Sequence, residues 1–331
     1  MWRADRSRQD WRRRLLNPIN KTVLSRAGRE TTRDRRGPHG RRGFEDNRPR
    51  APIGVFDSGV GGLTVVRDLN RVLPRESILY YADNGHVPYG GRPLSEIRAF
   101  ALEITDFLAA SGVKLIVFGC NISSAVALEP ARREHPHIPI IGLIEAGARA
   151  AILAHSGGPI GVIATQGTVA SGRYTEVLHA LAPAAKVIEQ ACPAFVPIVE
   201  RGGCDSPDAA AAAEEYVAPL RAAGVRTLIY GCSHYPLLER QIRRVMGREC
   251  VLVDPAVPLA RRARRVLTDA GLLSSAPRRE RYLVSGDAQE FSRLARRFLG
   301  RPLPPVERHS LWREEPVFAP EEPSLASVPS P

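Results

Sequence analysis

The chain has 331 residues, of which 44% are hydrophobic, enough for about two domains that each bury a core. Its net charge of +12 is concentrated at one end, because residues 1–50 hold 16 Lys+Arg against 6 Asp+Glu and the rest is close to neutral. No run of 18 consecutive apolar residues occurs, so the sequence predicts no membrane span. The five cysteines are an odd number without a Cys-x-x-Cys pair, which argues against a disulfide framework or a zinc ribbon and predicts a cytoplasmic protein.

The basic leader, residues 1–50, is predicted to be a disordered and solvated extension. Its arginines are not followed by the apolar segment of an export signal, and its acidic residues are not typical of an organellar transit peptide. Two other interpretations stay open: translation that starts downstream of the leader, and salt-sensitive contact of the leader with nucleic acid. The proline-rich residues 301–331 are predicted to be a disordered tail.

Between the leader and the tail, short apolar runs alternate with longer helical patterns. The apolar residues in these runs are continuous, which is typical of strands covered on both faces in a parallel sheet. Helical spacing predicts one helix after Ser95, ended by Gly112, and another with Ser206 as N-cap and Pro207 at its first position. The fold class is therefore α/β. The predicted strands are Ile53–Phe56, Ile78–Tyr81, Leu115–Phe118, Ile138–Ile144, Ile160–Ala164, Thr227–Tyr230 and Val251–Val253.

An internal repeat relates two halves of this core. The segment Ile53–Val55 has a counterpart in Ile160–Val162, and Phe118–Asn121 has one in Tyr230–Ser233. Each half thus supplies a cysteine, Cys120 or Cys232, directly after a buried strand and before the expected start of a helix. If the two halves face each other, the two thiols face each other as well.

Two opposed thiols can invert a carbon acid without a cofactor, since a thiolate removes the α-proton from one face and a thiol returns a proton to the other. Helix starts favour anions, so we expect the pKa of both thiols to be lowered. A single cysteine in such a place is more often inert core, but packing alone does not require one in both repeats. The glycine-rich turn Asp57–Gly62 offers backbone N–H groups to a carboxylate and lacks the ending of a nucleotide P-loop. The cysteines expected to be structural are Cys192, Cys204 and Cys250.

Lysine is scarce in this chain, with only Lys21, Lys114 and Lys186. A pyridoxal phosphate enzyme needs a lysine at its ligand site. Lys21 lies in the leader, and Lys114 precedes a predicted strand, whereas ligands of open α/β sheets gather at the carboxyl ends of strands. Pyridoxal phosphate chemistry is therefore not expected.

A set of segments, present in order and with suitable spacing, resembles glutamate racemase within the wider aspartate/glutamate racemase superfamily. The resemblance runs from about Pro52 to Gly300 and covers neither the leader nor the tail. The segments that carry it are Ile53–Gly62, Val87–Gly90, Gly119–Asn121, Ile141–Ala151, Ile160–Gly172, Ala191–Glu200 and Gly231–Pro236.

This resemblance implies two-base racemisation with Cys120 and Cys232 as the proton donor and acceptor pair, with no cofactor and no metal. It also implies that Asp57 assists Cys120 and that Glu200 and His234 assist Cys232. The simpler alternatives are a turn cap for Asp57 and a helix-start hydrogen bond for His234. The residues implied to contact the substrate are Asp57, Ser58, Tyr89, Gly90, Asn121, Ile122, Ser233 and His234.

One position departs from the family pattern. The family usually has a threonine after Cys-Asn, whereas this chain has Ile122, followed by Ser123 and Ser124. The lost hydroxyl removes a side-chain contact, although the backbone N–H at 122 is kept and a serine could substitute. At position 233 a serine replaces the more usual threonine, which keeps the hydroxyl.

The resemblance further implies two pseudo-symmetric parallel-sheet α/β domains that face each other across an active-site cleft. The first would comprise residues 51–145 plus 256–300, and the second residues 146–255. The implied activity is conversion of L-glutamate to D-glutamate for peptidoglycan precursor synthesis, and a homodimer is left open. The alternatives are a racemase of another amino acid such as aspartate, and a nucleic-acid-binding protein that acts through the leader and has a degenerate racemase body.

Overall fold

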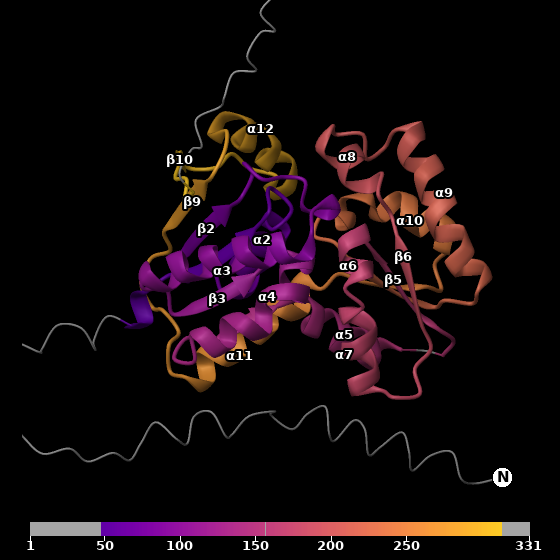
Figure 1. Cartoon of the computed structure of the whole chain (residues 1–331), viewed down its shortest axis with the longest axis horizontal. Helices are drawn as coiled ribbons and strands as arrows, with labels where there is room; N and C mark the ends of the chain where they lie inside the picture. The colour runs from indigo at the N-terminus through magenta and orange to yellow at the C-terminus, as the bar shows by residue number, and fades with distance from the viewer. Residues whose placement is uncertain (1–47, 156, 313–331) are drawn as a thin grey trace, which may run out of the picture.

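The computed structural model describes residues 48–155 and 157–312, which form two β-sheets with helices on both faces (Figure 1). Each strand is parallel to its neighbours in the sheet, so the predicted α/β class with parallel sheets is confirmed. Most of the predicted leader and the end of the predicted tail lie outside the described residues. Within the described residues, no helix has both the length and the apolarity needed to cross a membrane.

The first sheet has six strands in the order β10-β9-β2-β1-β3-β4. Successive side chains of a strand point to opposite faces, and both faces are buried here. Val55 of β1 belongs to the core formed with α2 and α11, whereas Phe56 belongs to the core formed with α3 and α4. The bounds are β1 Ile53–Asp57, β2 Ile78–Ala82, β3 Leu115–Phe118, β4 Ile140–Gly142, β9 Glu280–Val284, β10 Val306–Arg308, α2 Leu63–Val72, α3 Leu94–Ala110, α4 Asn121–Glu134, α11 Ala256–Asp269 and α12 Ala288–Leu299, with 3-10 helices η1 Arg48–Arg50 and η2 Tyr89–Gly91.

The second sheet has four strands in the order β6-β5-β7-β8. Val162 of β5 packs with α5 and α7 on one face, and its neighbour Ile163 packs toward α8, α9 and α10 on the other. As predicted, Ser206 caps α9, because its hydroxyl accepts a hydrogen bond from the N–H of Ala209. The bounds are β5 Ile160–Ala164, β6 Val187–Ala191, β7 Thr227–Gly231, β8 Val251–Val253, α5 Leu143–Ala154, α6 Gln166–Ala170, α7 Arg173–Leu181, α8 Phe195–Glu200, α9 Pro207–Ala222 and α10 Glu239–Met246, with the 3-10 helix η3 Tyr235–Leu238.

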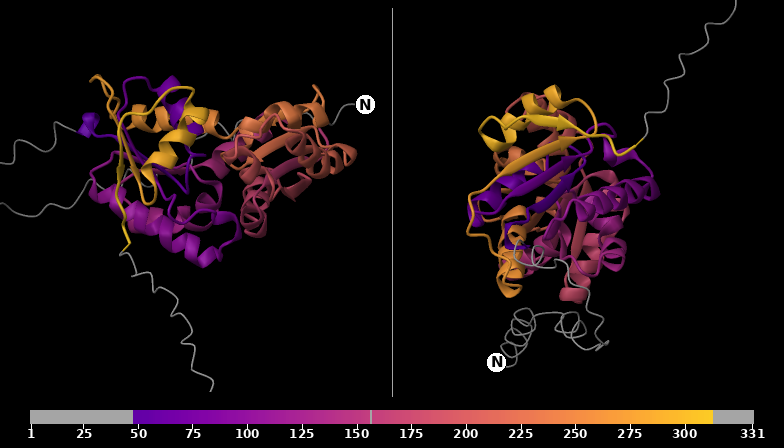
Figure 2. Two further views of the ribbon diagram at one scale, coloured as in Figure 1. Left: turned by 90° about the horizontal axis from the view of Figure 1, so that it is seen from above. Right: turned by 90° about the vertical axis from the view of Figure 1, so that its left-hand side faces the viewer.

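The internal repeat is visible in the topology. Strand β1 lies between β2 and β3, and strand β5 lies between β6 and β7, so the strands that lead to Cys120 and Cys232 occupy equivalent places. Figure 2 shows the two sheets and their helices as two lobes side by side. The loops after the strands differ, however. Cys120 is the N-cap of α4, whereas Cys232 is separated by two residues from η3, so the helix start expected directly after Cys232 is absent.

Three strands, β6, β9 and β10, were not predicted from the sequence. Strand β6 is only half-buried, β9 begins with Glu280 and Arg281, and β10 pairs with β9 alone, so none of the three has the continuous apolar run that reveals a central strand. The predicted strand Ile138–Ile144 contributes only β4, because α5 begins at Leu143. The prediction of a disordered tail is wrong for residues 301–312, which include β10. We propose that residues 256–312, rather than 256–300, return to the first domain.

Lys114 lies at the opposite end of the first sheet from Cys120, as the sequence predicted. Its ammonium group is buried, forms an ion pair with the carboxylate of Glu76, and donates hydrogen bonds to the carbonyls of Pro49 at 2.6 Å and Leu272 at 2.8 Å. All three donors of the ammonium group are therefore used. Glu76 also accepts a hydrogen bond from the N–H of Ser274 at 2.8 Å, so the pair joins four segments of the chain.

Replacing this lysine should destabilise the fold without changing the opposite end of the sheet, where Cys120 lies. We expect Lys114→Met to lower the free energy of unfolding by about 3 kcal/mol, because it leaves the Glu76 carboxylate buried and unpaired. The double variant Lys114→Met/Glu76→Gln should recover part of this loss, since it removes the orphaned charge. Urea unfolding of the three proteins measures both effects, and a single variant as stable as the wild type would contradict the assignment.

Candidate active site

A cavity of about 320 Å³ opens at the carboxyl ends of both sheets. Its volume is in the range of about 300–1,000 Å³ that is typical of small-molecule sites. Its wall comes from the loops after β1, β2 and β3 of the first sheet and after β5, β6 and β7 of the second. All of the catalytic and substrate-binding residues predicted from the sequence line this cavity, namely Asp57, Ser58, Tyr89, Gly90, Cys120, Asn121, Ile122, Glu200, Cys232, Ser233 and His234.

Cys120 lies on the first-sheet side of the cavity and is 5% exposed. Burial, followed by the negative charge of Asp57, raises the pKa of Cys120 to about 12, and hydrogen bonding from Ser123 lowers it only in part. The predicted lowering of this pKa is therefore wrong. The helix start at Asn121 does favour an anion, but the loss of water and the nearby carboxylate outweigh it.

Asp57 ends β1 and is almost completely buried. Its Oδ2 accepts hydrogen bonds from the N–H of Gly62 and from the hydroxyl of Ser233, the latter at 3.4 Å. Its Oδ1 has no hydrogen-bond partner among the described residues. Burial raises the pKa of Asp57, although the charge of His234 and the N–H of Gly62 act in the opposite direction. Asp57 therefore caps the glycine turn and also places a carboxyl group beside Cys120.

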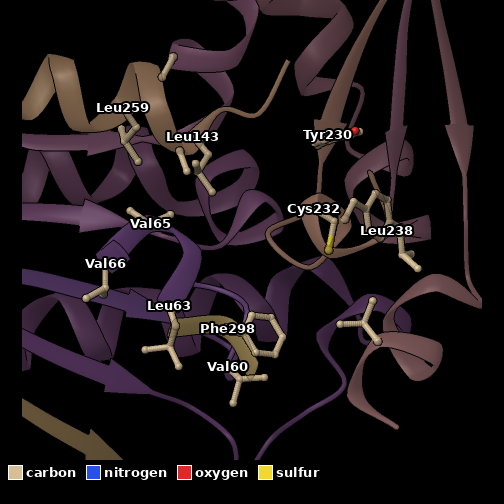
Figure 3. Packing of buried hydrophobic residues seen from close by; sticks show 14 of the residues in the cluster. Val60, Leu63, Val65, Val66, Leu143, Tyr230, Cys232, Leu238, Leu259 and Phe298 are labelled. Carbon is tan, nitrogen blue, oxygen red and sulfur yellow. The ribbon is translucent and has the colours of Figure 1, made fainter. Parts of the chain in front are cut away.

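His234 connects Cys232 with Glu200. Its Nδ1 lies 3.8 Å from the sulfur of Cys232, and its Nε2 lies 3.2 Å from Oε1 of Glu200. Burial opposes the charged form, but the hydrogen bonds to Cys232 and Glu200 outweigh it and raise the pKa of His234 to about 10. Phe298 of α12 packs edge-on against the imidazole at 5.5 Å between ring centroids. Phe298 and Cys232 belong to the same buried hydrophobic cluster (Figure 3). The ring is thus held between a thiol and a carboxylate, which a helix-start hydrogen bond alone would not require.

The glycine turn after β1 contacts the loop that carries Cys232. A Cβ atom on Gly61 would collide with Ser233 Oγ and His234 Nδ1, so only glycine permits this approach. Thr64, in the first turn of α2, donates a hydrogen bond to the carbonyl of Ser233 at 3.3 Å. The contact brings the carboxyl end of one sheet against that of the other.

The side chains of the remaining predicted binding residues offer fewer hydrogen-bonding groups to a substrate than expected. The Tyr89 hydroxyl donates to Asp83 at 2.6 Å, so Tyr89 presents its ring and backbone to the cavity. Asn121 accepts a hydrogen bond from Tyr174 at 2.8 Å, and its amide nitrogen is buried with no partner in the described part of the chain. Ile122 is buried and packs over Gly167, where a Cβ atom would collide with its side chain.

Several residues of the second half line the cavity although the sequence did not predict them there. Thr165 and Thr168 follow β5 and lie 3.1 Å apart through their hydroxyl oxygens. The internal repeat could have identified them, since they occupy the place that the Asp57 turn has after β1. Cys192, expected to be structural, lines the cavity because it follows β6, a strand that was not predicted. Among residues 48–155 and 157–312, no group of three or more His, Cys, Asp or Glu is arranged to hold a metal ion.

One small cavity contains a buried thiol from each of two repeated α/β units. This arrangement defines an enzyme that removes and returns protons on two sides of one substrate. A model of the Asp/Glu/hydantoin racemase family matches residues 53–263. The chain belongs to this family.

Several curated relatives of the chain are glutamate racemases. The one from Desulforudis audaxviator is 44% identical over 272 residues, covering 80% of this chain and 99% of the relative, and the one from Geobacter metallireducens is 42% identical over 81% and 99%. The crystal structure of glutamate racemase from Thermus thermophilus in complex with β-chloro-D-alanine has a TM-score of 0.72 and 42% identity, covering 80% of this chain and 98% of that one. The Francisella tularensis glutamate racemase in complex with D-glutamate has a TM-score of 0.75 and 32% identity, with the same coverage.

The raised pKa of His234 can be tested directly. We expect the imidazole to stay protonated at neutral pH and to lose its proton near pH 10, and Glu200→Gln to lower that pKa because it removes a carboxylate acceptor. Because the folded-state pKa is raised, its contribution to stability is complete below about pH 6.5, declines as the pH rises, and is gone above about 10.

NMR titration of the imidazole resonance, identified by its loss in His234→Asn, measures this pKa. Glu176→Gln is a matched control, because Glu176 is an exposed carboxylate that pairs with Arg173 outside the cavity. An unchanged midpoint in Glu200→Gln, or an equal change in the control, would show that Glu200 does not set the charge of His234.

Proposed function

We propose that this protein interconverts L- and D-glutamate by a two-base mechanism that needs no cofactor. The observation that carries the proposal is that Cys120 and Cys232, from equivalent ends of two repeated units, line the same cavity. Membership of the racemase family and the glutamate racemases among the relatives support the same reaction. The enzyme class is isomerase, amino-acid racemase.

The two thiols have different roles in each direction of the reaction. One sulfur, as thiolate, takes the α-proton from one face of the amino acid, and the other, as thiol, gives its proton to the opposite face. The raised pKa of Cys120 favours its thiol form, whereas the protonated His234 faces the sulfur of Cys232. We therefore assign the resting thiol to Cys120 and the first proton abstraction to the sulfur of Cys232, which lies 3.8 Å from His234. The proton transfers exchange the roles of the two sulfurs, so the reverse reaction begins from the exchanged state.

Asp57 and the His234–Glu200 pair would restore these protonation states. Asp57 lies beside Cys120, and its buried Oδ1 has no hydrogen-bond partner in the described part of the chain, so it can accept or return a proton on that side of the cavity. His234 contacts Cys232 and Glu200 with its two ring nitrogens and can do the same on the other side. Each thiol thus has a neighbouring acid or base that can exchange a proton with it.

The carbanion formed between the thiols needs donors that stabilise its charge. The amide nitrogen of Asn121 is buried and has no partner among the described residues, and Thr165 and Thr168, whose hydroxyls lie 3.1 Å apart, line the same cavity. These groups, with the backbone of the turn at Ser58, are suited to hold the two carboxylates of glutamate. The relatives favour glutamate over aspartate. We further propose that the reaction occurs in the cytoplasm and supplies D-glutamate for peptidoglycan, and the thiols support this because the mechanism requires them to stay reduced.

Proton exchange at the α-carbon tests the reaction. Incubation of L-glutamate with the purified protein in D2O, without added cofactor, should produce D-glutamate and place deuterium at the α-carbon, because the incoming proton comes from a thiol that exchanges with solvent. Mass spectrometry and chiral chromatography measure both products. If neither appears while a known racemase is active in the same buffer, the proposed function is wrong.

Single substitutions test the two-thiol assignment. Cys120→Ser and Cys232→Ser should each lower kcat/KM by about 10³-fold, since a serine hydroxyl is a far weaker acid than a thiol. Cys204→Ser is the matched control, because Cys204 is partly exposed and lies outside the cavity, and it should keep wild-type kinetics. Full activity in either active-site variant would refute the assignment.

A further inference from the structure

Another buried carboxylate, that of Asp83, lies behind the wall of the cavity. It directly follows β2 and is fully buried. Its carboxylate accepts hydrogen bonds from the hydroxyls of Tyr89 at 2.6 Å and Ser285 at 2.7 Å, and its Oδ1 lies 2.8 Å from His86 Nδ1. Its own N–H donates to the carbonyl of Asp57 at 3.0 Å. A buried carboxylate is costly unless its oxygens are bonded, so these contacts fix the loop around it.

The partner that matters for the cavity is Tyr89. Its side chain is 3% exposed and lines the cavity, while its hydroxyl is committed to Asp83. Burial and the charge of Asp83 raise the pKa of Tyr89, so the hydroxyl keeps its proton and remains the donor. The Tyr89 side chain therefore shapes the cavity, and its hydrogen bond to Asp83 fixes its position.

An aromatic cluster packs around His86 and Tyr89, two of the residues that contact the Asp83 carboxylate. The ring of His86 stacks on Phe100 at 4.3 Å between centroids, with 23° between the planes, and Trp312 packs edge-on against His86 at 4.4 Å. Phe100 also contacts Trp312 at 5.4 Å and Tyr89 at 6.0 Å. The cluster thus links the C-terminal segment to the cavity wall.

The segment that ends in Trp312 is anchored to the first sheet. Strand β10 pairs with β9, the N–H of His309 donates to Val284 at 2.7 Å, and the Tyr81 hydroxyl donates to the carbonyl of His309 at 2.9 Å. These contacts fix the backbone that places the Trp312 ring against His86.

We propose that Asp83 is a positioning residue for the substrate cavity, because its hydrogen bond holds Tyr89 in its binding position. Trp312 supports this role by packing against the His86–Phe100 pair. This inference rests on the proposed racemase function. Neither residue touches the reacting atoms, so the two act on substrate affinity and leave proton transfer between the thiols unchanged.

Steady-state kinetics with L-glutamate test the proposal. Asp83→Asn, which keeps the shape but loses the charge, should raise KM by about tenfold, and Trp312→Ala should raise it by about fivefold, with kcat changed by less than about threefold in both. A role in stability alone would instead lower the fraction of active enzyme and so reduce the apparent kcat at an unchanged KM. Trp312→Phe should restore most of the affinity, because it keeps an aromatic edge against His86.

Leu303→Ala is the matched control, because Leu303 is an apolar residue of the same C-terminal segment that packs into the other core. It should leave KM at the wild-type value. In the double variant Asp83→Asn/Trp312→Ala, the rise in KM should be smaller than the product of the single effects, since Trp312 acts through Asp83.

The outcomes separate the two proposals. A wild-type protein that does not racemise glutamate overturns both. An active wild type with unchanged KM in Asp83→Asn and Trp312→Ala overturns only the positioning role, as does a rise in KM of equal size in Leu303→Ala. Multiplicative effects in the double variant overturn the coupling of Trp312 to Asp83.

Discussion

The contact on which the rest of the site depends is the close packing of the Gly61 turn against the Cys232 loop. Without a Cβ at this position, the backbone after β1 reaches Ser233 and His234 from the opposite sheet. The same turn wraps around Asp57, where a Cβ on Gly62 would lie 2.6 Å from the Asp57 Cβ. Two glycines thus allow two sheets to meet at their carboxyl ends, and the meeting removes water from the acids and bases between them.

Burial at this meeting point makes the two sides of the cavity electrostatically unequal, although the units that build them are repeats. On one side, burial and a neighbouring carboxylate raise the pKa of Cys120 and favour its neutral form. On the other, hydrogen bonds to Cys232 and Glu200 raise the pKa of His234 and keep it protonated. A two-base reaction requires one thiol and one thiolate at the start, and this asymmetry provides the difference that a symmetric site would lack.

How much could be predicted from the sequence depended on burial. Central strands such as β1 and β5 are apolar on both faces and were recognised, and the repeat located Cys120 and Cys232 after equivalent strands. Strands that contain charged or polar residues carry no such signal, so β6 and β9 were missed, and with β6 the cysteine that follows it, Cys192. The direction of the Cys120 pKa shift was predicted from the helix start alone, which is local, whereas the burial and the Asp57 charge that decide it come from tertiary packing.

Ile122 shows how such packing changes the meaning of a motif. As a departure from the family pattern, an isoleucine in place of threonine indicates a lost polar contact. In the structure its side chain fills the space left by Gly167 of the opposite unit, so it closes the boundary between the two sheets. Polar groups are still available close by, because Thr165 and Thr168 flank that glycine and line the same cavity. The position therefore exchanges a hydrogen-bonding role for a packing role, while the hydroxyl-bearing residues of the facing loop line the cavity.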